Sequence, residues 1–157
     1  MFDPAAVEPV VELLADLAEQ GRALEFGIGT GWIALPLTGR GVPVVGIDNS
    51  EATVGRLRAK PGGEAIDVTI GDFATTRVEG EFSVVYLVFN TIFNLVTQEE
   101  QVACFRNAAA HLRRRRPVRD RDRGTGPPEP PALLSRAELR LCSYLARKQD
   151  QVSFRGM

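Results

Sequence analysis

A glycine-rich turn is the part of the sequence best suited to bind a ligand. Gly27, Gly29 and Gly31 form the glycine loop (27–31), and Glu25 stands two residues before it. Glycines let a backbone turn tightly and approach a ligand closely. Asp48 follows Gly31 by 17 positions, close to the offset of about 20 at which an acid accepts hydrogen bonds from ribose hydroxyls. We expect a nucleotide-like ligand; the alternative is that the glycines only make the turn.

The glycine spacing narrows the kind of ligand. A dinucleotide fingerprint needs glycine at position 32 or 34, where the chain has Trp32 and Ala34. The tolerated alanine variant keeps a dinucleotide formally open. The Glu25 carboxylate, however, would oppose a pyrophosphate, because like charges repel. A ligand with a cationic end fits better.

Alternating strands and helices must position these residues. The apolar and β-branched runs predict buried strands at 23–26, 42–47, 65–70 and 82–89. Helical patterns cover 10–20, 32–37, 50–60 and 98–112, with Pro9 in the first turn of the first and Ser50 capping the third. This alternation predicts an α/β fold with a parallel, doubly wound sheet.

The last of these helices has an apolar stripe. Val102, Phe105, Ala109 and Leu112 recur at helical spacing and are expected to form its buried face. His111 lies near its end, where a structural role is expected. Trp32, beside the glycine loop, is expected to serve packing.

Four stretches resemble, in order and spacing, the first four motifs of the class I S-adenosylmethionine-dependent methyltransferases. They are ALEFGIGTG, VVGIDNS, VTIGDFATT and FSVVYLVFNTIFNL, and the resemblance runs from about residue 10 to residue 112. It implies a Rossmann-like parallel sheet and S-adenosyl-L-methionine as the cofactor. It also implies that Glu25 and the glycine loop cradle the methionine part of that cofactor, whose ammonium explains the acid.

The same resemblance assigns roles to residues after the second and third strands. Asp48 would accept hydrogen bonds from both ribose hydroxyls, and Asn49 would lie along the adenosine. Asp72 would accept from the adenine amino group, while Phe73 covers the ring or offers its backbone amide. The alternative for Asp72 and Phe73 is a strand-ending turn with a core aromatic.

A catalytic residue is harder to identify. Asn90 follows the fourth strand, where the family places a polar residue beside the methyl donor, although an asparagine there is often only a cap or turn. Thr91, Phe93 and Asn94 are weaker candidates. Methyl transfer from a sulfonium needs mainly alignment and desolvation of the nucleophile, so no histidine–cysteine pair is required. The acceptor is therefore not defined.

Composition limits the other classes of function. The 157 residues, 44% hydrophobic and 25% charged, correspond to one ordinary soluble domain. No apolar run is long enough for a membrane span and no leader pattern is visible, so we expect a cytoplasmic protein. The family resemblance implies that it is bacterial. Cys104, Cys142 and the single His111 are too few for a metal site.

The end of the chain differs in kind from the rest. Residues 1–112 hold 7 basic and 15 acidic side chains, whereas residues 113–157 hold 12 and 5. Three interpretations of this basic tail are a nucleic-acid arm, a disordered appendage and a reading-frame slip. With permissible codons, a one-base shift turns 118–126 into a buried-strand pattern. We favour the slip, which resequencing would test, and expect an incomplete sheet with the fourth strand as an apolar edge.

The prediction is therefore a methyltransferase domain at 1–112 that transfers a methyl group to an O, N or C nucleophile, with a small molecule as the expected substrate. An inactive cofactor-binding remnant is the first alternative, and an NAD-dependent oxidoreductase is a more distant one. Nucleic acid is not expected as a partner, because acids interleave with the basic residues of the tail and aromatics are scarce there.

Overall fold

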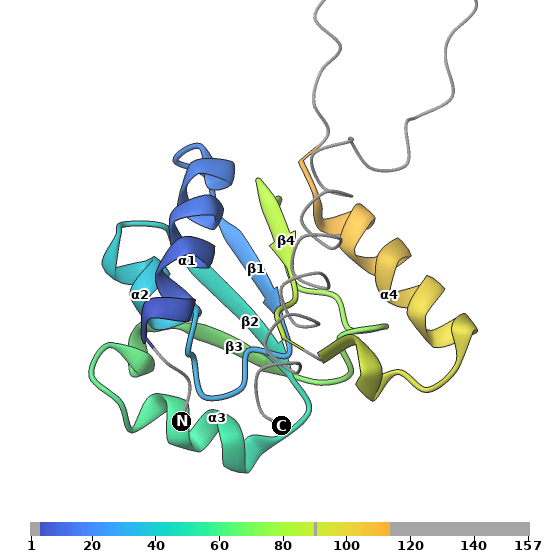
Figure 1. Cartoon of the computed structure of the whole chain (residues 1–157). Helices are drawn as coiled ribbons and strands as arrows, with labels where there is room; N and C mark the ends of the chain where they lie inside the picture. The colour runs from blue at the N-terminus through green and yellow to red at the C-terminus, as the bar shows by residue number, and fades with distance from the viewer. Residues whose placement is uncertain (1–3, 90, 114–157) are drawn as a thin grey trace, which may run out of the picture. The chain divides into compact units, whose positions relative to one another are not determined.

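The computed structural model describes residues 4–89 and 91–113, which form one α/β unit (Figure 1). Its strands are β1 (Ala23–Phe26), β2 (Val44–Asp48), β3 (Asp67–Ile70) and β4 (Val84–Tyr86). Its helices are α1 (Pro4–Ala18), α2 (Ala34–Gly39), α3 (Glu51–Arg58) and α4 (Gln98–His111), with 3-10 turns η1 (Gly63–Ala65) and η2 (Thr91–Asn94).

The four strands form one parallel sheet in the order β3-β2-β1-β4. Every residue of β1 and β2 is buried, as expected for central strands covered on both faces. The predicted α/β fold with a parallel sheet is confirmed. Because β1 and β2 are parallel neighbours, the glycine loop after β1 and Asp48 at the end of β2 meet at the same edge.

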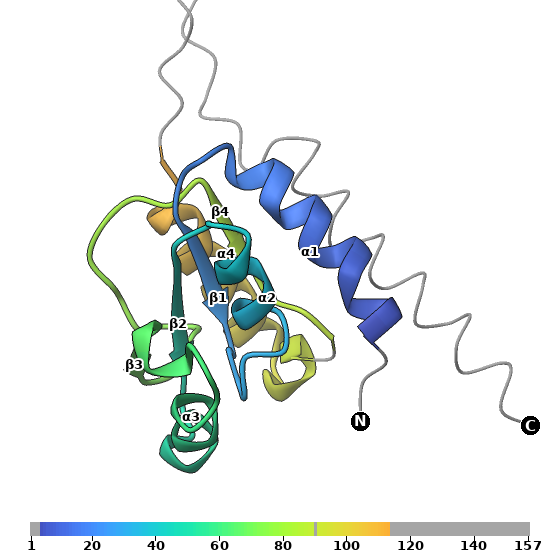
Figure 2. The ribbon, with the colours of Figure 1, turned by 90° about the vertical axis from the view of Figure 1, so that its left-hand side faces the viewer.

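Helices cover both faces of the sheet. In Figure 2, α2 lies in front of the sheet and α4 behind it, while α1 lies beside α2. The prediction for Pro9 was wrong, because α1 begins at Pro4 and carries Pro9 inside it. Val7 and Val11 are both buried, so the apolar face of α1 extends back past Pro9. Burial of this extra turn outweighs the backbone hydrogen bond that the proline removes.

The third predicted helix begins as expected. Ser50 is the N-cap of α3, and its hydroxyl oxygen accepts a hydrogen bond from the backbone N–H of Thr53 at 3.2 Å. Capping of this kind fixes where a helix starts. The helix therefore starts three residues after Asp48, at Glu51, and the N–H of its N-cap Ser50 also donates to the Asp48 carboxylate at the end of β2.

The buried face of α4 differs from the expected one. Val102 and Phe105 are 39% and 41% exposed, whereas Cys104, Asn107 and His111 are buried. Asn107 Nδ2 donates to the backbone oxygens of Phe73 and Thr76, both at 2.8 Å.

His111 completes this attachment of α4. Its Nε2 accepts from the backbone N–H of Val78 at 3.1 Å, and its Nδ1 lies 2.8 Å from the Asn107 oxygen. Its ring also packs edge-on against Phe26 and Phe82. Hydrogen bonds to backbone groups thus orient α4 so that the face with Asn107 and His111 is turned toward the core. The structural role predicted for His111 is confirmed.

The chain returns to the sheet edge directly after α4. Phe82 forms a parallel bridge with Leu112: its N–H donates to the His111 oxygen at 3.0 Å, and its oxygen accepts from the Arg113 N–H at 2.8 Å. This pairing runs along the side of β4 away from β1, where a fifth parallel strand would begin. Residues 114–157, which include Cys142 and nearly all of the predicted basic tail, lie outside the described residues.

Candidate functional site

The glycine loop adopts a conformation that other residues would resist. Gly27, Gly29 and Gly31 have φ angles of 69°, 57° and 77°, in the left-handed region that favours glycine. A Cβ on Gly27 would collide with the Thr91 methyl group, and one on Gly31 with Leu57. The N–H groups of Gly27 and Ile28 both donate to the Ile47 oxygen, at 2.8 and 3.2 Å. The loop is thereby fixed over the end of β2.

Asp48 is joined to the glycine loop. It is 8% exposed, and its Oδ2 accepts a hydrogen bond from the Gly29 N–H at 2.7 Å. Its Oδ1 accepts from the Ser50 N–H at 2.9 Å. Each carboxylate oxygen has two lone pairs, so both oxygens retain capacity for ribose hydroxyls. Asn49, next in the chain, is exposed at the same edge.

Glu25 lies almost completely buried beside this loop. It is 2% exposed, and its Oε2 accepts a hydrogen bond from the Tyr86 hydroxyl at 3.0 Å. Burial raises the pKa of Glu25 to about 8, and nearby Asp48 adds to the rise, while Tyr86 and a backbone hydrogen bond from Ala34 oppose it. Two neighbouring acids with little water create a strong preference for a cation.

Asp72 and Phe73 divide between surface and core. Asp72 is exposed, and its Oδ1 accepts from the Ala74 N–H at 2.8 Å, which makes a tight turn after β3. The Phe73 ring is 6% exposed and stacks on Phe26 with 5.9 Å between ring centroids. The ring is therefore a core residue, as in the structural alternative, and it does not cover a ligand. Of the two contacts expected from Phe73, only the one from its backbone amide to the adenine ring remains open.

The segment after β4 approaches the glycine loop. Thr91 begins η2, its hydroxyl donates to the Val88 oxygen at 2.7 Å, and its methyl group faces Gly27. Phe89 has a φ of 55°, a left-handed conformation that costs about 1–2 kcal/mol for a residue with a side chain. Strained backbone of this kind is common at functional sites. Asn90, the candidate catalytic residue, lies outside the described residues.

The sequence analysis missed two residues of this region, Tyr86 and Lys60. Lys60 Nζ donates to the Thr30 oxygen at 2.7 Å and lies 4.9 Å from the centre of the Trp32 ring. Trp32 is 40% exposed, so its predicted packing role is corrected: the ring takes part in a cation–π contact beside the glycine loop. A lysine 28 positions away from Trp32 gives no local signal of this contact.

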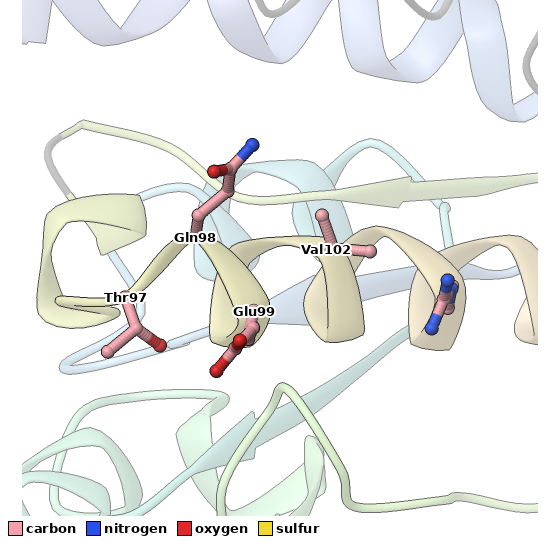
Figure 3. Close-up of a pocket in the computed structure, with 5 residues that line it drawn as sticks. Thr97, Gln98, Glu99 and Val102 are labelled. Atoms are coloured by element: carbon pink, nitrogen blue, oxygen red, sulfur yellow. The ribbon is translucent and has the colours of Figure 1, made fainter.

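A separate hollow of about 480 Å³ lies at the start of α4. Figure 3 shows Gln98 and Val102 projecting from one side of the helix and Thr97 and Glu99 from the other. Arg106 also lines it, and the described lining residues include none of the predicted cofactor-binding residues. The predicted cofactor-binding residues therefore lie outside this hollow, at and near the glycine loop.

Residues 4–89 and 91–113 offer neither a metal site nor a membrane-spanning helix. That part of the chain holds no group of three or more acidic, histidine or cysteine side chains placed to bind a metal ion. None of its helices is both long and apolar enough to cross a membrane. Its one cysteine, Cys104, is buried in the hydrophobic core.

Comparison with known proteins decides the family. A family model described as "Methyltransferase domain" matches residues 23–115, the stretch from β1 to the end of α4. The chain belongs to this family. The methyltransferase domain thus contains all of the predicted site residues.

Individual relatives agree with the family. The chain is 33% identical over 90 residues to the cypemycin N-terminal methyltransferase of a Streptomyces species, covering 57% of this chain and 37% of that protein. The CcbJ methyltransferase from Streptomyces caelestis is similar in structure, with a TM-score of 0.65, 37% identity, and coverage of 70% of this chain and 46% of that one.

A third relative was solved with S-adenosylmethionine bound. CalS10, an amino pentose methyltransferase from Micromonospora echinaspora, is 25% identical with a TM-score of 0.59, over 69% of this chain and 46% of that one. The chain therefore spans less than half the length of each of these three relatives. These comparisons give no support to the oxidoreductase alternative.

Proposed function

We propose that this chain binds S-adenosyl-L-methionine at the glycine loop and transfers its sulfonium methyl group to a small-molecule acceptor. The observation that carries the proposal is the loop itself: three left-handed glycines fixed beside two buried acids, Glu25 and Asp48. The backbone can approach a ligand there, and the acids favour a ligand that carries positive charge. S-adenosylmethionine offers an ammonium, a sulfonium and a ribose.

Each residue of the site has a task in this proposal. Glu25 attracts the methionine ammonium, and Asp48 accepts hydrogen bonds from the ribose hydroxyls while it holds Gly29. Asn49 lies along the adenosine. Asp72 accepts from the adenine amino group, and the Phe73 backbone amide faces the same ring. These residues lie at or just after the carboxyl ends of the parallel strands β1, β2 and β3, which share one edge.

The reaction itself asks little acid–base chemistry of the protein. The nucleophile must lie in line with the methyl group and the sulfur, and water must be excluded, because a hydrated nucleophile attacks slowly. We propose that the segment after β4, whose Thr91 methyl group lies against Gly27, orients the acceptor. Asn90 remains our proposed candidate for a polar contact to it.

Relatives favour nitrogen as the atom that receives the methyl group. One is named as an N-terminal methyltransferase and another as an amino pentose methyltransferase. We extend to this chain a small-molecule amine as the acceptor and, because these relatives come from Streptomyces and Micromonospora, a location in the bacterial cytoplasm. The proposed domain ends near residue 112, and the tail at 113–157 is proposed to be out of frame.

Isothermal titration with S-adenosylmethionine, its demethylated product S-adenosylhomocysteine and NAD tests the cofactor. We expect binding of the first two and none of NAD; binding of NAD alone would overturn the proposal. A radiolabelled methyl donor offered with a panel of amino sugars and short peptides then tests turnover. Binding with no transfer to any acceptor would favour the inactive remnant.

A further inference from the structure

Tyr86 is a buried polar group that the proposed function has not yet used. It lies on β4 directly opposite Glu25 on β1, in register, and only 3% of it is exposed. Its hydroxyl donates to Glu25 Oε2 at 3.0 Å, and this hydrogen bond is itself buried. A buried hydroxyl aimed at a buried acid fixes the direction in which that acid points.

The surroundings of this pair are well defined. From β2, Asp48 repels a negative charge on Glu25, and from α2 a backbone hydrogen bond from Ala34 supports that charge. The side chains that α1 buries are Val7, Val11, Leu14 and Ala18, all apolar. In the described part of the chain, the remaining buried polar side chains, Asn107 and His111, belong to α4. The protonation state of Glu25 is therefore set first by its burial and then by Tyr86, Asp48 and Ala34.

We propose that Tyr86 is the positioning residue for Glu25 and that the pair couples cofactor binding to the release of a proton. This rests on the proposed function, because the ligand that displaces the proton is the ammonium of S-adenosylmethionine. Tyr86 holds the Glu25 carboxyl group in one orientation beside the glycine loop. The ammonium of the bound ligand then stabilises the negative charge of the ionised Glu25 carboxylate.

The proton balance is simple. Burial raises the pKa of Glu25 to about 8, so at pH 7 most molecules without ligand carry a protonated carboxyl group. When the ammonium binds, the Glu25 O–H bond breaks and the proton passes to solvent. The carboxylate that remains accepts the Tyr86 hydrogen bond and faces the ligand, whose own charge is unchanged. An opposite charge nearby lowers the pKa of an acid, which drives this step.

The sign of the pH dependence follows from this balance. Below pH 8 the proton must leave before the ammonium is fully stabilised, so affinity rises with pH, by at most about tenfold per unit for one proton. Above pH 8 Glu25 is already ionised, so the ratio of wild-type affinity to Glu25→Gln affinity becomes constant, while the ligand's own amino group titrates in both measurements. Ligands that lack the amino group gain nothing from the ionised acid.

The experiment is titration calorimetry of the full chain with S-adenosylmethionine at pH 7, in buffers that differ in ionisation enthalpy. This series counts protons released on binding. The difference between the wild type and Glu25→Gln at the same pH cancels the ionisation of the ligand itself, and we expect it to approach one proton. With 5′-methylthioadenosine, which has no amino acid part, the expected difference is zero.

Tyr86→Phe tests the positioning role. Removing the hydroxyl takes away a hydrogen bond to the charged carboxylate, so affinity at pH 7 should fall by about tenfold or more. The pH at which affinity, taken relative to Glu25→Gln, levels off should also move upward, a shift that a merely structural role of Tyr86 would not produce. Thr38→Val is the matched control, because it removes another buried hydroxyl, on α2, and should leave both quantities unchanged.

The outcomes separate this inference from the proposed function. If the wild type binds neither S-adenosylmethionine nor S-adenosylhomocysteine, the proposed function fails. If it binds them with no more proton release than Glu25→Gln, the proton coupling is wrong. If Tyr86→Phe keeps the wild-type pH profile, the positioning role is wrong. Circular dichroism and thermal unfolding establish that each variant is folded, and a Tyr86→Phe variant that fails to fold would show a structural role instead.

Discussion

The glycine-loop edge of the sheet and the surface formed by η2 and α4 are built in opposite ways. At the glycine-loop edge, acids are buried and their oxygens accept hydrogen bonds from backbone or side-chain donors. On the η2–α4 surface, by contrast, large apolar side chains face outward: Phe93 is 71% exposed and Val96 84%. Val102 and Phe105 continue this surface along α4. Acidic side chains are thus buried at the glycine-loop edge, whereas apolar side chains are exposed on the η2–α4 surface.

This difference shows which half of the reaction the described residues can support. Recognition of a cofactor needs a few fixed polar groups, and β1, β2 and the glycine loop provide them within a short stretch of chain. An apolar surface of this kind normally marks a place that another segment or molecule covers. The residues that we propose for the cofactor therefore lie in a well-ordered, hydrogen-bonded part of the described chain, whereas the η2–α4 surface leaves apolar side chains exposed.

The largest expected effect tests whether the glycine-loop edge is dry. The folded-state pKa of Glu25, about 8, lies above its ordinary value of 4.5. Its contribution to the free energy of unfolding is therefore fully present below pH 4.5 and lost as pH rises to 8, by a few kcal/mol. Denaturant unfolding of the wild type and Glu25→Gln across this range measures it. Parallel pH profiles for the two proteins would mean that water reaches Glu25.

A smaller effect sharpens the role of the second acid. Asp48→Ala should weaken S-adenosylmethionine binding by about 1–3 kcal/mol, because charge-assisted hydrogen bonds to the ligand and to Gly29 are lost. Titration calorimetry measures this change. Asp67→Ala, which removes an exposed acid from neighbouring β3, is the control and should bind as the wild type does. Equal affinity of the Asp48 variant would refute the ribose role.

The next effect concerns the α4 side alone. Thr97 and Glu100 form a reciprocal capping box at the start of α4, so Thr97→Ala should lower the free energy of unfolding by about 1 kcal/mol. Cofactor affinity should stay the same, since the cofactor edge does not depend on this cap. Chemical denaturation and calorimetry measure the two quantities, with exposed Thr75→Ala as control. A large loss of affinity would show that the two regions are coupled.

The smallest effect tests the exposed surface itself. Val96→Ser should change stability by no more than about 0.5 kcal/mol, because a residue that is mostly exposed loses little burial. Val45→Ser, at a site 5% exposed in β2, should cost several times more. A strongly destabilised Val96 variant would reveal that this surface is covered in solution.

Much of the fold could be predicted from local sequence. Buried parallel strands need continuous apolar or β-branched runs, and left-handed turns need glycine, so β1, β2 and the glycine loop have unmistakable patterns. The stripe of Val102 and Phe105 was misleading, because Asn107 and His111 find backbone partners in the segment after β3. Hydrogen bonds to distant residues overrode the apolar pattern of the helix.

The site shows the same division. Asp48 could be found by its distance from the glycine loop and its place at the end of a strand. Tyr86 could not, because its pairing with Glu25 depends on the register between β1 and β4, separated by 61 positions in the sequence. The Phe73 ring was assigned two roles, and only packing against Phe26 decided between them.

The attachment of α4 by Asn107 and His111 has a mechanical consequence. These two side chains, one helical turn apart, hold the backbone of Phe73, Thr76 and Val78. These hydrogen bonds couple the position of α4 to that of the segment after β3. We therefore expect a displacement of α4 to strain the turn at Asp72, although β3 and β4 lie at opposite ends of the strand order.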